Sequence, residues 1–244
     1  MNAAPSTQGK AALITGGAKR VGRAIALRLA TEGYDILLHY HRSRDEAVAT
    51  QKDIEALGRR CLPMEADLSD VRMASSLISY ALQQMPHCSL LVNSASIFEQ
   101  RSFLESDVAI CDRHFSLNFG APVFLTQAFA KKAQRGCVIN LLDTAITQNK
   151  HSHFFYLLSK KALAEFTRMA AAELAPAIRV NGVCPGIVLT GGGWDETYMQ
   201  RKEASVPLRK LGSVEAVCEA VYWLAEQDRI TGQFIFVDGG EHLI

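Results

Sequence analysis

Short apolar runs alternate with longer segments of helical periodicity along almost the whole chain, and this alternation is the strongest constraint on the fold. Strands that alternate with helices form βαβ units and a parallel sheet. Short apolar strands without polar alternation are typical of a sheet covered on both faces. The sequence therefore predicts one doubly wound α/β domain over residues 1–244, with a seven-stranded parallel sheet and helices on both faces. The expected strands are residues 11–15, 34–40, 60–64, 89–92, 138–142, 179–183 and 233–237, and the expected helices are residues 20–31, 45–57, 69–84, 110–133, 155–174 and 214–226.

Charge and hydropathy exclude several partner classes. The formal net charge of the 244-residue chain is +1, so there is no overall basic field for nucleic acid. No apolar run approaches the roughly 18 residues of a membrane span, and the N-terminus lacks the pattern of a signal peptide. None of the six cysteines forms a C-x-x-C pair, which is typical of free thiols in a reducing cytosol. We expect a cytoplasmic protein without a metal site. His151 and His153 are interpreted as solvent-exposed loop residues because no third ligand accompanies them.

The least regular segment is residues 187–209, which contains three consecutive glycines at 191–193. Glycines cannot hold a fixed backbone cheaply, so we interpret this segment as a mobile lid over a substrate. Trp194 and Tyr198 would line the pocket, or else pack within the lid or against another subunit.

The first expected strand runs into a glycine turn, TGGAKRVG at residues 15–22, and then into a helix. Gly16 permits the tight turn, and Gly22 permits close approach of helix and strand. The helix N-terminus then offers free N–H groups to a pyrophosphate. The spacing is not G-x-G-x-x-G, because Arg20, with Lys19 before it, stands where the middle glycine is usual. The alternative is a glycine-rich helix start with two solvated cations.

The end of the second expected strand distinguishes NAD from NADP. An acid at this position binds the ribose 2′-hydroxyl, whereas an arginine suits a 2′-phosphate. The chain reads HYHRS at residues 39–43 and has no acid before Asp45. Arg42 can bind a phosphate as a planar fork, and Ser43 can add a hydroxyl. NADPH is favoured, and the alternative is a solvated arginine that begins the next helix.

The next two strand ends carry small and polar residues. Asp67 could accept a hydrogen bond from the adenine amino group, or it could cap a helix. The tetrad from Asn93 to Ser96 leaves room for a cofactor, although a plain turn explains it equally well.

Tyr156 and Lys160 are four residues apart in an expected helix and so share one face. An ammonium beside a phenol favours the phenolate and lowers the phenol's pKa, which gives a tunable proton donor. Most such pairs are surface pairs, but this one follows the fifth strand of a nucleotide-binding sheet.

Together these motifs resemble the short-chain dehydrogenase/reductase family over essentially the whole chain. The matching residues, in chain order, are T-G-x-x-x-R-x-G at 15–22, Asp67-Leu68, Asn93 to Ser96, Asn118, Y-x-x-x-K at 156–160, N-G-x-x-P-G at 181–186 and D-G-G at 238–240.

The resemblance implies a single Rossmann domain, hydride transfer with a nicotinamide cofactor, and a homotetramer built through the long helices. It implies that Tyr156 donates the proton, that Lys160 holds the ribose hydroxyls and that Asn118 positions a water. Thr190 would contact the nicotinamide amide. The implied cofactor contacts are Gly16, Lys19, Arg20, Val21, Gly22, His39, Tyr40, His41, Arg42, Ser43, Asp67, Leu68, Asn93, Ser94, Ala95, Ser96, Tyr156, Lys160, Pro185, Gly186, Val188 and Thr190.

Three departures from the family pattern resemble the pteridine reductases. Asp143 replaces the usual catalytic serine thirteen residues before Tyr156, Arg20 replaces a glycine, and Ser96 with Phe98 replaces the usual N-N-A-G ending. In that subfamily the pterin lies between the nicotinamide and an aromatic ring, for which Phe98 is the matching position. Arg20 and Ser96 would contact the pterin, Asp143 would work with Tyr156, and Trp194 is a further candidate substrate contact.

The aspartate also makes chemical sense. Ketone reduction needs a neutral hydrogen bond to an alkoxide, which an ionised carboxylate cannot supply. Reduction of a C=N bond needs a proton delivered to nitrogen, which an aspartate near Tyr156 can relay, and the same carboxylate raises the pKa of the tyrosine. The alternatives are that Asp143 is a turn residue and that Phe98 is an ordinary core aromatic.

The sequence thus predicts an NADPH-dependent pteridine reductase acting on a dihydropterin or dihydrofolate, with antifolates such as methotrexate as inhibitors. Two alternatives stay open: a carbonyl reductase for a keto-acyl thioester or a sugar, and a non-catalytic NADP-binding sensor. The sequence does not specify which pterin or folate is the substrate.

Overall fold

The computed structural model of the protein describes residues 9–188 and 195–244, and its centre is a seven-stranded sheet. The strand order is β3-β2-β1-β4-β5-β6-β7, and every neighbouring pair is parallel, as predicted. Each strand lies within two residues of its expected bounds at either end. The strands are β1 (Lys10–Ile14), β2 (Tyr34–Tyr40), β3 (Cys61–Glu65), β4 (Cys88–Asn93), β5 (Gly136–Leu141), β6 (Ile178–Pro185) and β7 (Phe234–Val237).

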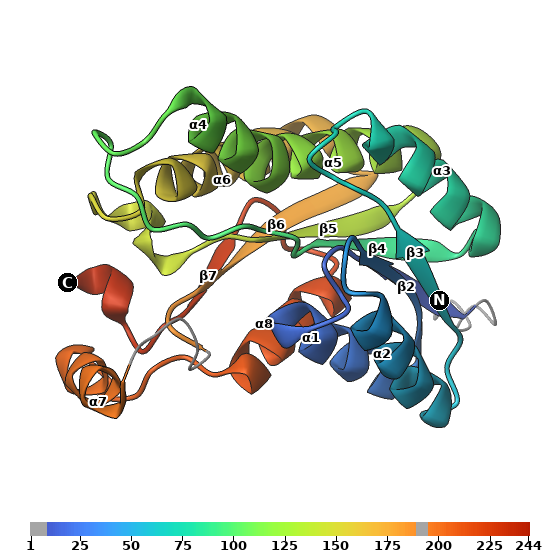
Figure 1. The fold of residues 1–244 in the computed structure, drawn as a ribbon. Coiled ribbons are helices and arrows are strands. Elements are labelled where there is room, and N and C mark those ends of the chain that lie inside the picture. The colour runs from blue at the N-terminus through green and yellow to red at the C-terminus, as the bar shows by residue number, and fades with distance from the viewer. Residues whose placement is uncertain (1–8, 189–194) are drawn as a thin grey trace.

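Helices cover both faces of the sheet (Figure 1). One layer holds α1, α2 and α8, and the other holds α3, α4, α5 and α6 (Figure 1). The helices are α1 (Arg20–Thr31), α2 (Arg44–Ala56), α3 (Met73–Gln84), α4 (Val108–His114), α5 (Ala121–Lys132), α6 (Phe154–Leu174), α7 (Glu196–Ser205) and α8 (Val214–Glu226).

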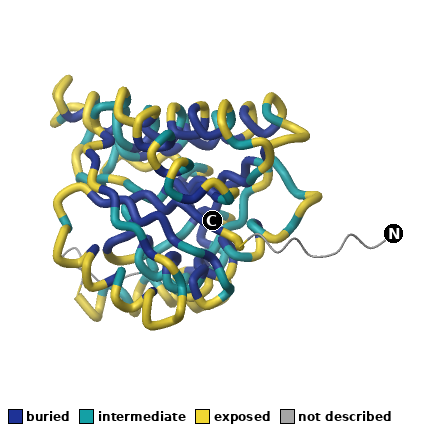
Figure 2. The backbone as a smooth tube through the Cα atoms, turned by 90° about the vertical axis from the view of Figure 1, so that its right-hand side faces the viewer, coloured by how far each residue is buried: buried dark blue, intermediate teal, exposed yellow. Residues whose placement is uncertain are grey.

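The core follows from the alternation of side chains along each strand. In β1, Ala12 and Ile14 face the layer that contains α1 and α8, whereas Ala11 and Leu13 face the layer that contains α3 and α5. Figure 2 shows the sheet as a buried centre between helices that are exposed on their outer sides. Among the described residues, no helix has the length and apolar character needed to cross a bilayer.

The long helix expected over residues 110–133 is interrupted. The structure has α4, then a π-helical turn over Phe115–Gly120, then α5. Pro122 lies in the first turn of α5 and has no N–H, so it cannot complete an α-helical bond to the carbonyl of Asn118. π-Helical turns inside α-helices are frequent at functional sites, and this one carries Asn118.

Two further boundaries differ from the expectation. Helix α3 begins at Met73 and not at residue 69, because the Asp67 carboxylate accepts hydrogen bonds from both the N–H and the hydroxyl of Ser69 and holds a local turn. Within the segment expected to be irregular, α7 is a helix of ten residues. Its N-cap is Asp195, whose carboxylate accepts from the Tyr198 N–H at 2.7 Å.

Candidate active site

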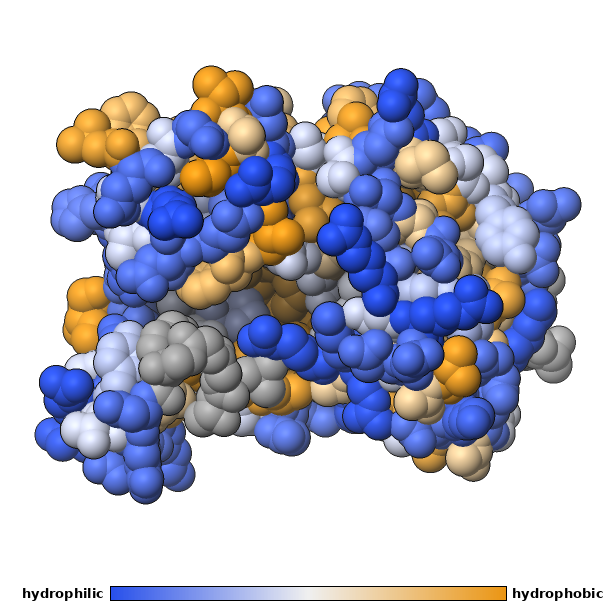
Figure 3. Space-filling model, in the orientation of Figure 1, coloured by the Kyte–Doolittle hydropathy of each residue, from blue (hydrophilic) through white to orange (hydrophobic). Residues whose placement is uncertain are grey.

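The carboxyl ends of β1, β4, β5 and β6 meet at one edge of the sheet. After β1 the chain moves outward to β2 and β3, and it returns to place β4 beside β1 on the other side. Ligands of open α/β sheets bind outside the strand ends at this reversal. Figure 3 shows a hollow between the two helix layers on the side where α7 lies. The predicted site residues of all four strand ends therefore gather at one edge.

The glycine turn after β1 packs too closely for any side chain. Gly16 has a φ of +64°, and a Cβ on Gly22 would lie 2.2 Å from the Gly16 carbonyl oxygen. Helix α1 begins directly after this turn, with no side-chain cap and no acidic residue in its first turn. Its first N–H groups are therefore available to an anion, and the turn fits a dinucleotide pyrophosphate.

Thr15 joins the ends of β1 and β4. Its hydroxyl oxygen accepts hydrogen bonds from the N–H groups of Ser94 and Ala95, at 2.9 and 3.0 Å. The same hydroxyl donates to the Val92 carbonyl at 3.4 Å. Thr15 was expected only as the first residue of the family motif, without a role of its own. In the structure it holds the glycine turn against the segment that follows β4.

His39 supports the turn from within the protein. Its Nδ1 accepts a hydrogen bond from the Gly16 N–H at 3.1 Å, so Nε2 carries the proton and donates to the Ala66 carbonyl at 3.0 Å. Burial lowers the pKa of His39 to about 4, and the ring is neutral. Both ring nitrogens are thus used inside the protein, and His39 positions the glycine turn without a free nitrogen for the cofactor.

The end of β2 presents the residues that we associated with the 2′-phosphate. Arg42 is exposed, and Ser43 is the N-cap residue of α2 but its hydroxyl makes no cap bond, so the helix that follows uses neither side chain. Asp67 does not cap a helix, since α3 begins later. Its carboxylate is exposed and lies 3.7 Å from His41. The Asp67 carboxylate instead holds the turn at Ser69, and its contact with the adenine stays a prediction.

Arg20 has a left-handed backbone. Its φ is +54°, a conformation that glycine adopts readily and that other residues adopt at a cost of about 1–2 kcal/mol. Arg20 occupies the position where a glycine is usual in this turn. Strained residues that persist in this way cluster at ligand-binding sites.

A hydrogen bond joins Tyr156, in the first turn of α6, to Asp143. The Tyr156 hydroxyl donates to Asp143 Oδ2 at 2.7 Å, and Asp143 Oδ1 accepts from the Ala145 N–H at 2.7 Å. Asp143 lies just beyond β5 and caps a short 3₁₀-helix over Thr144–Thr147. The carboxylate is therefore fixed at one oxygen by the backbone and presents the other to the tyrosine.

The pKa of Tyr156 is raised, as was expected from Asp143, and is not lowered, as was expected from Lys160. The pKa of Tyr156 lies well above its ordinary value, first because the phenol is buried and then because of the Asp143 carboxylate. The Lys160 ammonium lies 5.9 Å from the centre of the tyrosine ring and donates to the Leu141 carbonyl at 2.7 Å. Burial lowers the pKa of Lys160 to about 8. Tyr156 is thus a neutral phenol that holds its proton.

Asn118 is completely buried and joins the loop after β4 to α6. Its Oδ1 accepts from the Ile97 N–H at 2.9 Å and from the Ser96 hydroxyl at 3.1 Å. Its Nδ2 donates to the Ile97 carbonyl at 3.0 Å and to the Ser159 hydroxyl at 3.3 Å. Ser159 in turn donates to the Tyr156 carbonyl at 2.6 Å. Asn118 therefore positions Ser96 relative to Tyr156.

Phe98 lies beside Tyr156, and the interpretation of His153 as a solvent-exposed loop residue was wrong. The rings of Phe98 and Tyr156 are 4.7 Å apart and nearly perpendicular. The ring of His153 stacks on Phe98, with centroids 4.4 Å apart and an interplanar angle of 24°. His153 is the residue before α6 and lies three positions before Tyr156. This spacing was the only sign in the sequence that His153 lies close to the tyrosine. Phe98 is 54% exposed, so it is not an ordinary core aromatic.

Asn93 is buried and does not reach the hollow. It pairs in register with Asn140 of β5, and its Nδ2 donates to the Asn140 side-chain oxygen at 2.8 Å. Asn140 donates in turn to the Thr167 hydroxyl of α6 at 2.8 Å. Asn93 thus holds β4, β5 and α6 in place, and the small residues after it form the surface of the site.

The D-G-G motif connects the C-terminal residues to the segment that follows Asp143. Asp238 accepts hydrogen bonds from the Thr144 hydroxyl and from the N–H and Nδ1 of His242, and a Cβ on Gly186 would lie 2.8 Å from the Asp238 Cβ. Glu241, which is buried, forms ion pairs with Lys150 at 3.2 Å and with Lys202 of α7 at 3.8 Å. Among the other predicted contacts, Pro185 and Val188 lie at the end of β6 and just beyond it, whereas Thr190 and Trp194 are outside the described residues.

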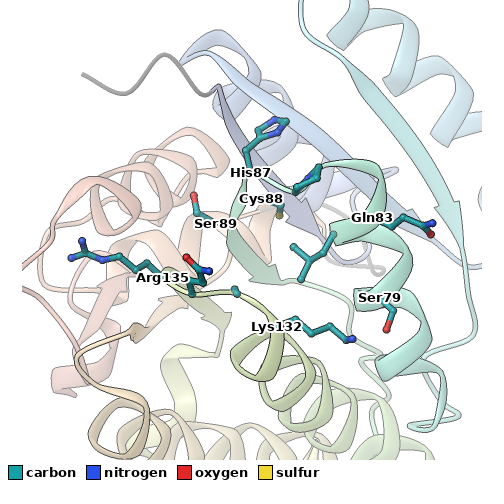
Figure 4. Close-up of a pocket in the computed structure, with 11 residues that line it drawn as sticks. Ser79, Gln83, His87, Cys88, Ser89, Lys132 and Arg135 are labelled. Carbon is teal, nitrogen blue, oxygen red and sulfur yellow. The ribbon is translucent and has the colours of Figure 1, made fainter. Parts of the chain in front are cut away.

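A separate surface hollow of about 630 Å³ lies at the other edge of the sheet, where β4 and β5 begin. Figure 4 shows Lys132 and Arg135 at this hollow pointing away from each other. Lys132 lies in the last turn of α5, where a cation complements the helix dipole. This hollow is remote from the tyrosine and has no convergent polar groups. In the described parts of the chain, no cluster of three or more His, Cys, Asp or Glu residues could hold a metal ion.

A glycine turn at the reversal of a parallel sheet, with a half-buried tyrosine and a buried lysine at the same edge, is typical of an oxidoreductase that uses a dinucleotide. The short chain dehydrogenase family model matches residues 10–200. The chain belongs to the short-chain dehydrogenase/reductase family, whose members use NAD or NADP.

Similar proteins from this family cover nearly the whole chain. Pteridine reductase 1 of Leishmania tarentolae is 34% identical over 95% of this chain and 96% of that protein. The structure of FolM alternative dihydrofolate reductase 1 from Brucella suis, solved in complex with NADP, is 36% identical with a TM-score of 0.87, over 96% of this chain and 95% of that one. The 3-oxoacyl-[acyl-carrier-protein] reductase FabG of Staphylococcus epidermidis is 29% identical over 96% of this chain and 99% of that protein.

Proposed function

We propose that this oxidoreductase is an NADPH-dependent pteridine reductase that reduces a C=N bond of a dihydropterin or a dihydrofolate. The observation that carries the proposal is the 2.7 Å hydrogen bond from the Tyr156 hydroxyl to the Asp143 carboxylate. A pteridine reductase and an alternative dihydrofolate reductase are among the similar proteins at about 35% identity.

The tyrosine–aspartate pair suits proton delivery to nitrogen. Because the pKa of Tyr156 is raised, the phenol stays protonated in ordinary buffers and acts as an acid. Its hydrogen points to Asp143, so it turns to a substrate nitrogen only when Asp143 carries a proton and donates to the phenol oxygen instead. Asp143 would then restore the proton that Tyr156 gives to the substrate and would be recharged from solvent.

The cofactor would bind along the carboxyl edge from the glycine turn to Tyr156. The first N–H groups of α1 would hold the pyrophosphate, and Arg42 with Ser43 would hold the 2′-phosphate of NADPH. Lys160 would hold the ribose hydroxyls with its ammonium group. Bound NADPH would supply the hydride to the substrate carbon.

The substrate would lie flat against Phe98, whose ring is 54% exposed beside Tyr156. Flat aromatic rings stack favourably on phenylalanine, whereas an extended acyl chain or a puckered sugar gains little from such a wall. Arg20 and Ser96 lie at the neighbouring strand ends and would contact the polar edge of the pterin. Arg20 has a strained left-handed backbone, and residues that keep such strain are common where a side chain contacts a ligand.

A carbonyl reductase is the second candidate, because a 3-oxoacyl-[acyl-carrier-protein] reductase is also similar over nearly the whole chain. Asp143 argues against it, because reduction of a ketone forms an oxyanion beside the tyrosine, and a carboxyl group 2.7 Å from the tyrosine repels that oxyanion whenever it is ionised.

The decisive experiment follows oxidation of the reduced nicotinamide with NADPH and NADH in parallel, from acid to neutral pH. The substrates are dihydrobiopterin, dihydromonapterin, dihydrofolate and a keto-acyl thioester. We expect turnover of at least one dihydropterin or dihydrofolate with a preference for NADPH. Turnover of the thioester alone would overturn the proposal. Methotrexate should raise the melting temperature of the NADPH complex and inhibit turnover.

We also propose that the protein is a homotetramer assembled through its long helices. Large apolar side chains of α5 and α6 are exposed, among them Phe124, Leu158 and Met169. Such residues on adjacent helices are typical of a subunit interface. Sedimentation equilibrium should give four times the mass of one chain, and the mass of a single chain would exclude the assembly.

A further inference from the structure

Phe98 stands on an irregular segment, yet its position is fixed by contacts on both sides. On one side the backbone of Ile97 both donates to and accepts from the Asn118 amide, at 2.9 and 3.0 Å. On the other side Arg101 forms an isolated parallel bridge with His153, and its carbonyl accepts from the Phe154 N–H at 3.0 Å. The segment that carries Phe98 is therefore tied to the start of α6.

The ring of Phe98 is fixed by His153 in the same way. The stacked pair has centroids 4.4 Å apart, and His153 is the residue immediately before α6, three positions before Tyr156. His153 Nδ1 lies 2.9 Å from the Ser152 hydroxyl, which sets the orientation of the imidazole. His153 covers one face of Phe98, and 54% of the phenylalanine remains exposed for a ligand.

The charge state of His153 suits a stacking partner. Burial lowers its pKa, the Lys150 ammonium lowers it further, and the Asp143 carboxylate opposes both. The imidazole is therefore a flat neutral ring at neutral pH, with no net charge to hold it in water.

We propose that His153 is a positioning residue that fixes the plane of Phe98, and that the Phe98–His153 stack selects flat fused-ring substrates. This inference rests on the proposed pteridine reductase function. A wall of two stacked rings, held at a set angle to Tyr156, offers a flat fused-ring substrate a rigid surface on which to stack. Preorganisation of this kind acts on substrate affinity and leaves the proton transfer itself unchanged.

The test compares three variants in steady-state kinetics with NADPH and the best dihydropterin. His153→Ala removes the stacking ring, His153→Phe keeps a ring without nitrogen, and His151→Ala is the matched control, because His151 is an exposed histidine of the same loop. For His153→Ala we expect KM to rise roughly three- to ten-fold, the effect of losing one aromatic stack, with kcat and its pH profile unchanged. His153→Phe should restore KM, and His151→Ala should leave it as in the wild type.

The outcomes distinguish a failure of the proposed function from a failure of the role proposed for His153. NADPH binding, measured by fluorescence titration, shows that each variant is folded. A wild-type protein that reduces no dihydropterin overturns the proposed function, and this inference with it. An active wild type whose His153→Ala variant keeps its KM overturns the inference alone. A His153→Phe variant that loses kcat or shifts the pH profile would assign His153 to proton transfer and overturn the positioning role.

Discussion

Tyr156 donates its phenolic hydrogen to Asp143 Oδ2 across 2.7 Å, so in this structure the acid faces a carboxylate. Burial and the carboxylate both raise the pKa of Tyr156, and the usual activation of such a tyrosine as a phenolate is therefore opposed here. The two side chains thus form one hydrogen-bonded pair, on which the proposed proton delivery depends. Several consequences of this geometry, and of the residues that support it, can be measured.

Asp143→Asn should lower kcat on a dihydropterin roughly 100-fold or more, the usual contribution of general acid catalysis. Asparagine can keep the acceptor bond from the Ala145 N–H, but it carries no dissociable proton to restore Tyr156. Steady-state rates and NADPH affinity are the measurements, and affinity should be unchanged. Asp70→Asn, on an exposed ion pair with Arg72, is the control. A faster Asp143→Asn enzyme would mean that the carboxylate merely blocks the tyrosine.

His39 should make the stability of the protein depend on pH. Its pKa is about 4 in the folded protein and 6.5 in an unfolded chain, so the unfolded chain binds the extra proton between these values. Stability due to the neutral imidazole is thus complete above pH 6.5 and is lost as the pH falls toward 4, by about 3 kcal/mol in total. Urea unfolding at several pH values measures this slope.

Two variants separate the titration of His39 from its hydrogen bonds. His39→Gln can serve both the Gly16 N–H and the Ala66 carbonyl and does not titrate, so its slope over this range should be smaller than that of the wild type. His39→Ala leaves both backbone groups unpaired and should lose about 3 kcal/mol at neutral pH, together with NADPH affinity. Because alanine does not titrate, its stability relative to the wild type should recover as the pH falls toward 4. Equal pH slopes in the wild type and in His39→Gln would refute this assignment.

The sequence predicted the fold well because the fold depends on local periodicity. Each apolar run had the length of a buried strand, and βαβ connections allow only a parallel sheet with its carboxyl ends together. That rule alone brings Gly16, Ser96 and Asp143 to one edge. The break at the π-helical turn was also present in the sequence as Pro122, but the apolar periodicity continues through it and hid the signal.

The features of the site that could not be predicted from the sequence depend on contacts between segments that are far apart in the chain. Nothing local to His153 shows that Phe98 will stack on it, because the contact joins residues far apart in the chain. For the pKa of Tyr156, the sequence predicted two opposed effects, a decrease from Lys160 and an increase from Asp143, but not which of them is larger. The pKa rises because burial and Asp143 outweigh an ammonium that is directed at the Leu141 carbonyl. The role of His39 likewise requires three strands to be in place.

Burial of the Lys160 ammonium should lower the free energy of unfolding of the protein. Its pKa is about 8 in the folded protein against 10.5 in the unfolded chain, so burial of the ammonium destabilises the fold below pH 8 by about 3 kcal/mol. The unfolded chain holds more protons between pH 8 and 10.5, and the stability of the wild type should therefore rise across that range. Lys160→Met should lack this rise and should be inactive. A wild type and variant with parallel pH profiles would contradict the lowered pKa.

At position 20 we expect a glycine variant to be more stable than an alanine variant, which is the reverse of the usual order in a helix. Inside a helix alanine is more stable than glycine by about 1 kcal/mol, but Arg20 begins α1 with a φ of +54°, where any Cβ is strained. Arg20→Gly should therefore be more stable than Arg20→Ala by about 1 kcal/mol, as measured by urea unfolding. Both variants lack the guanidinium, so under the proposed function both should raise KM for the pterin equally. Arg23, one turn further into α1, provides the control pair: there Arg23→Ala should be the more stable variant, and the same order at position 20 would show that the left-handed backbone is absent in solution.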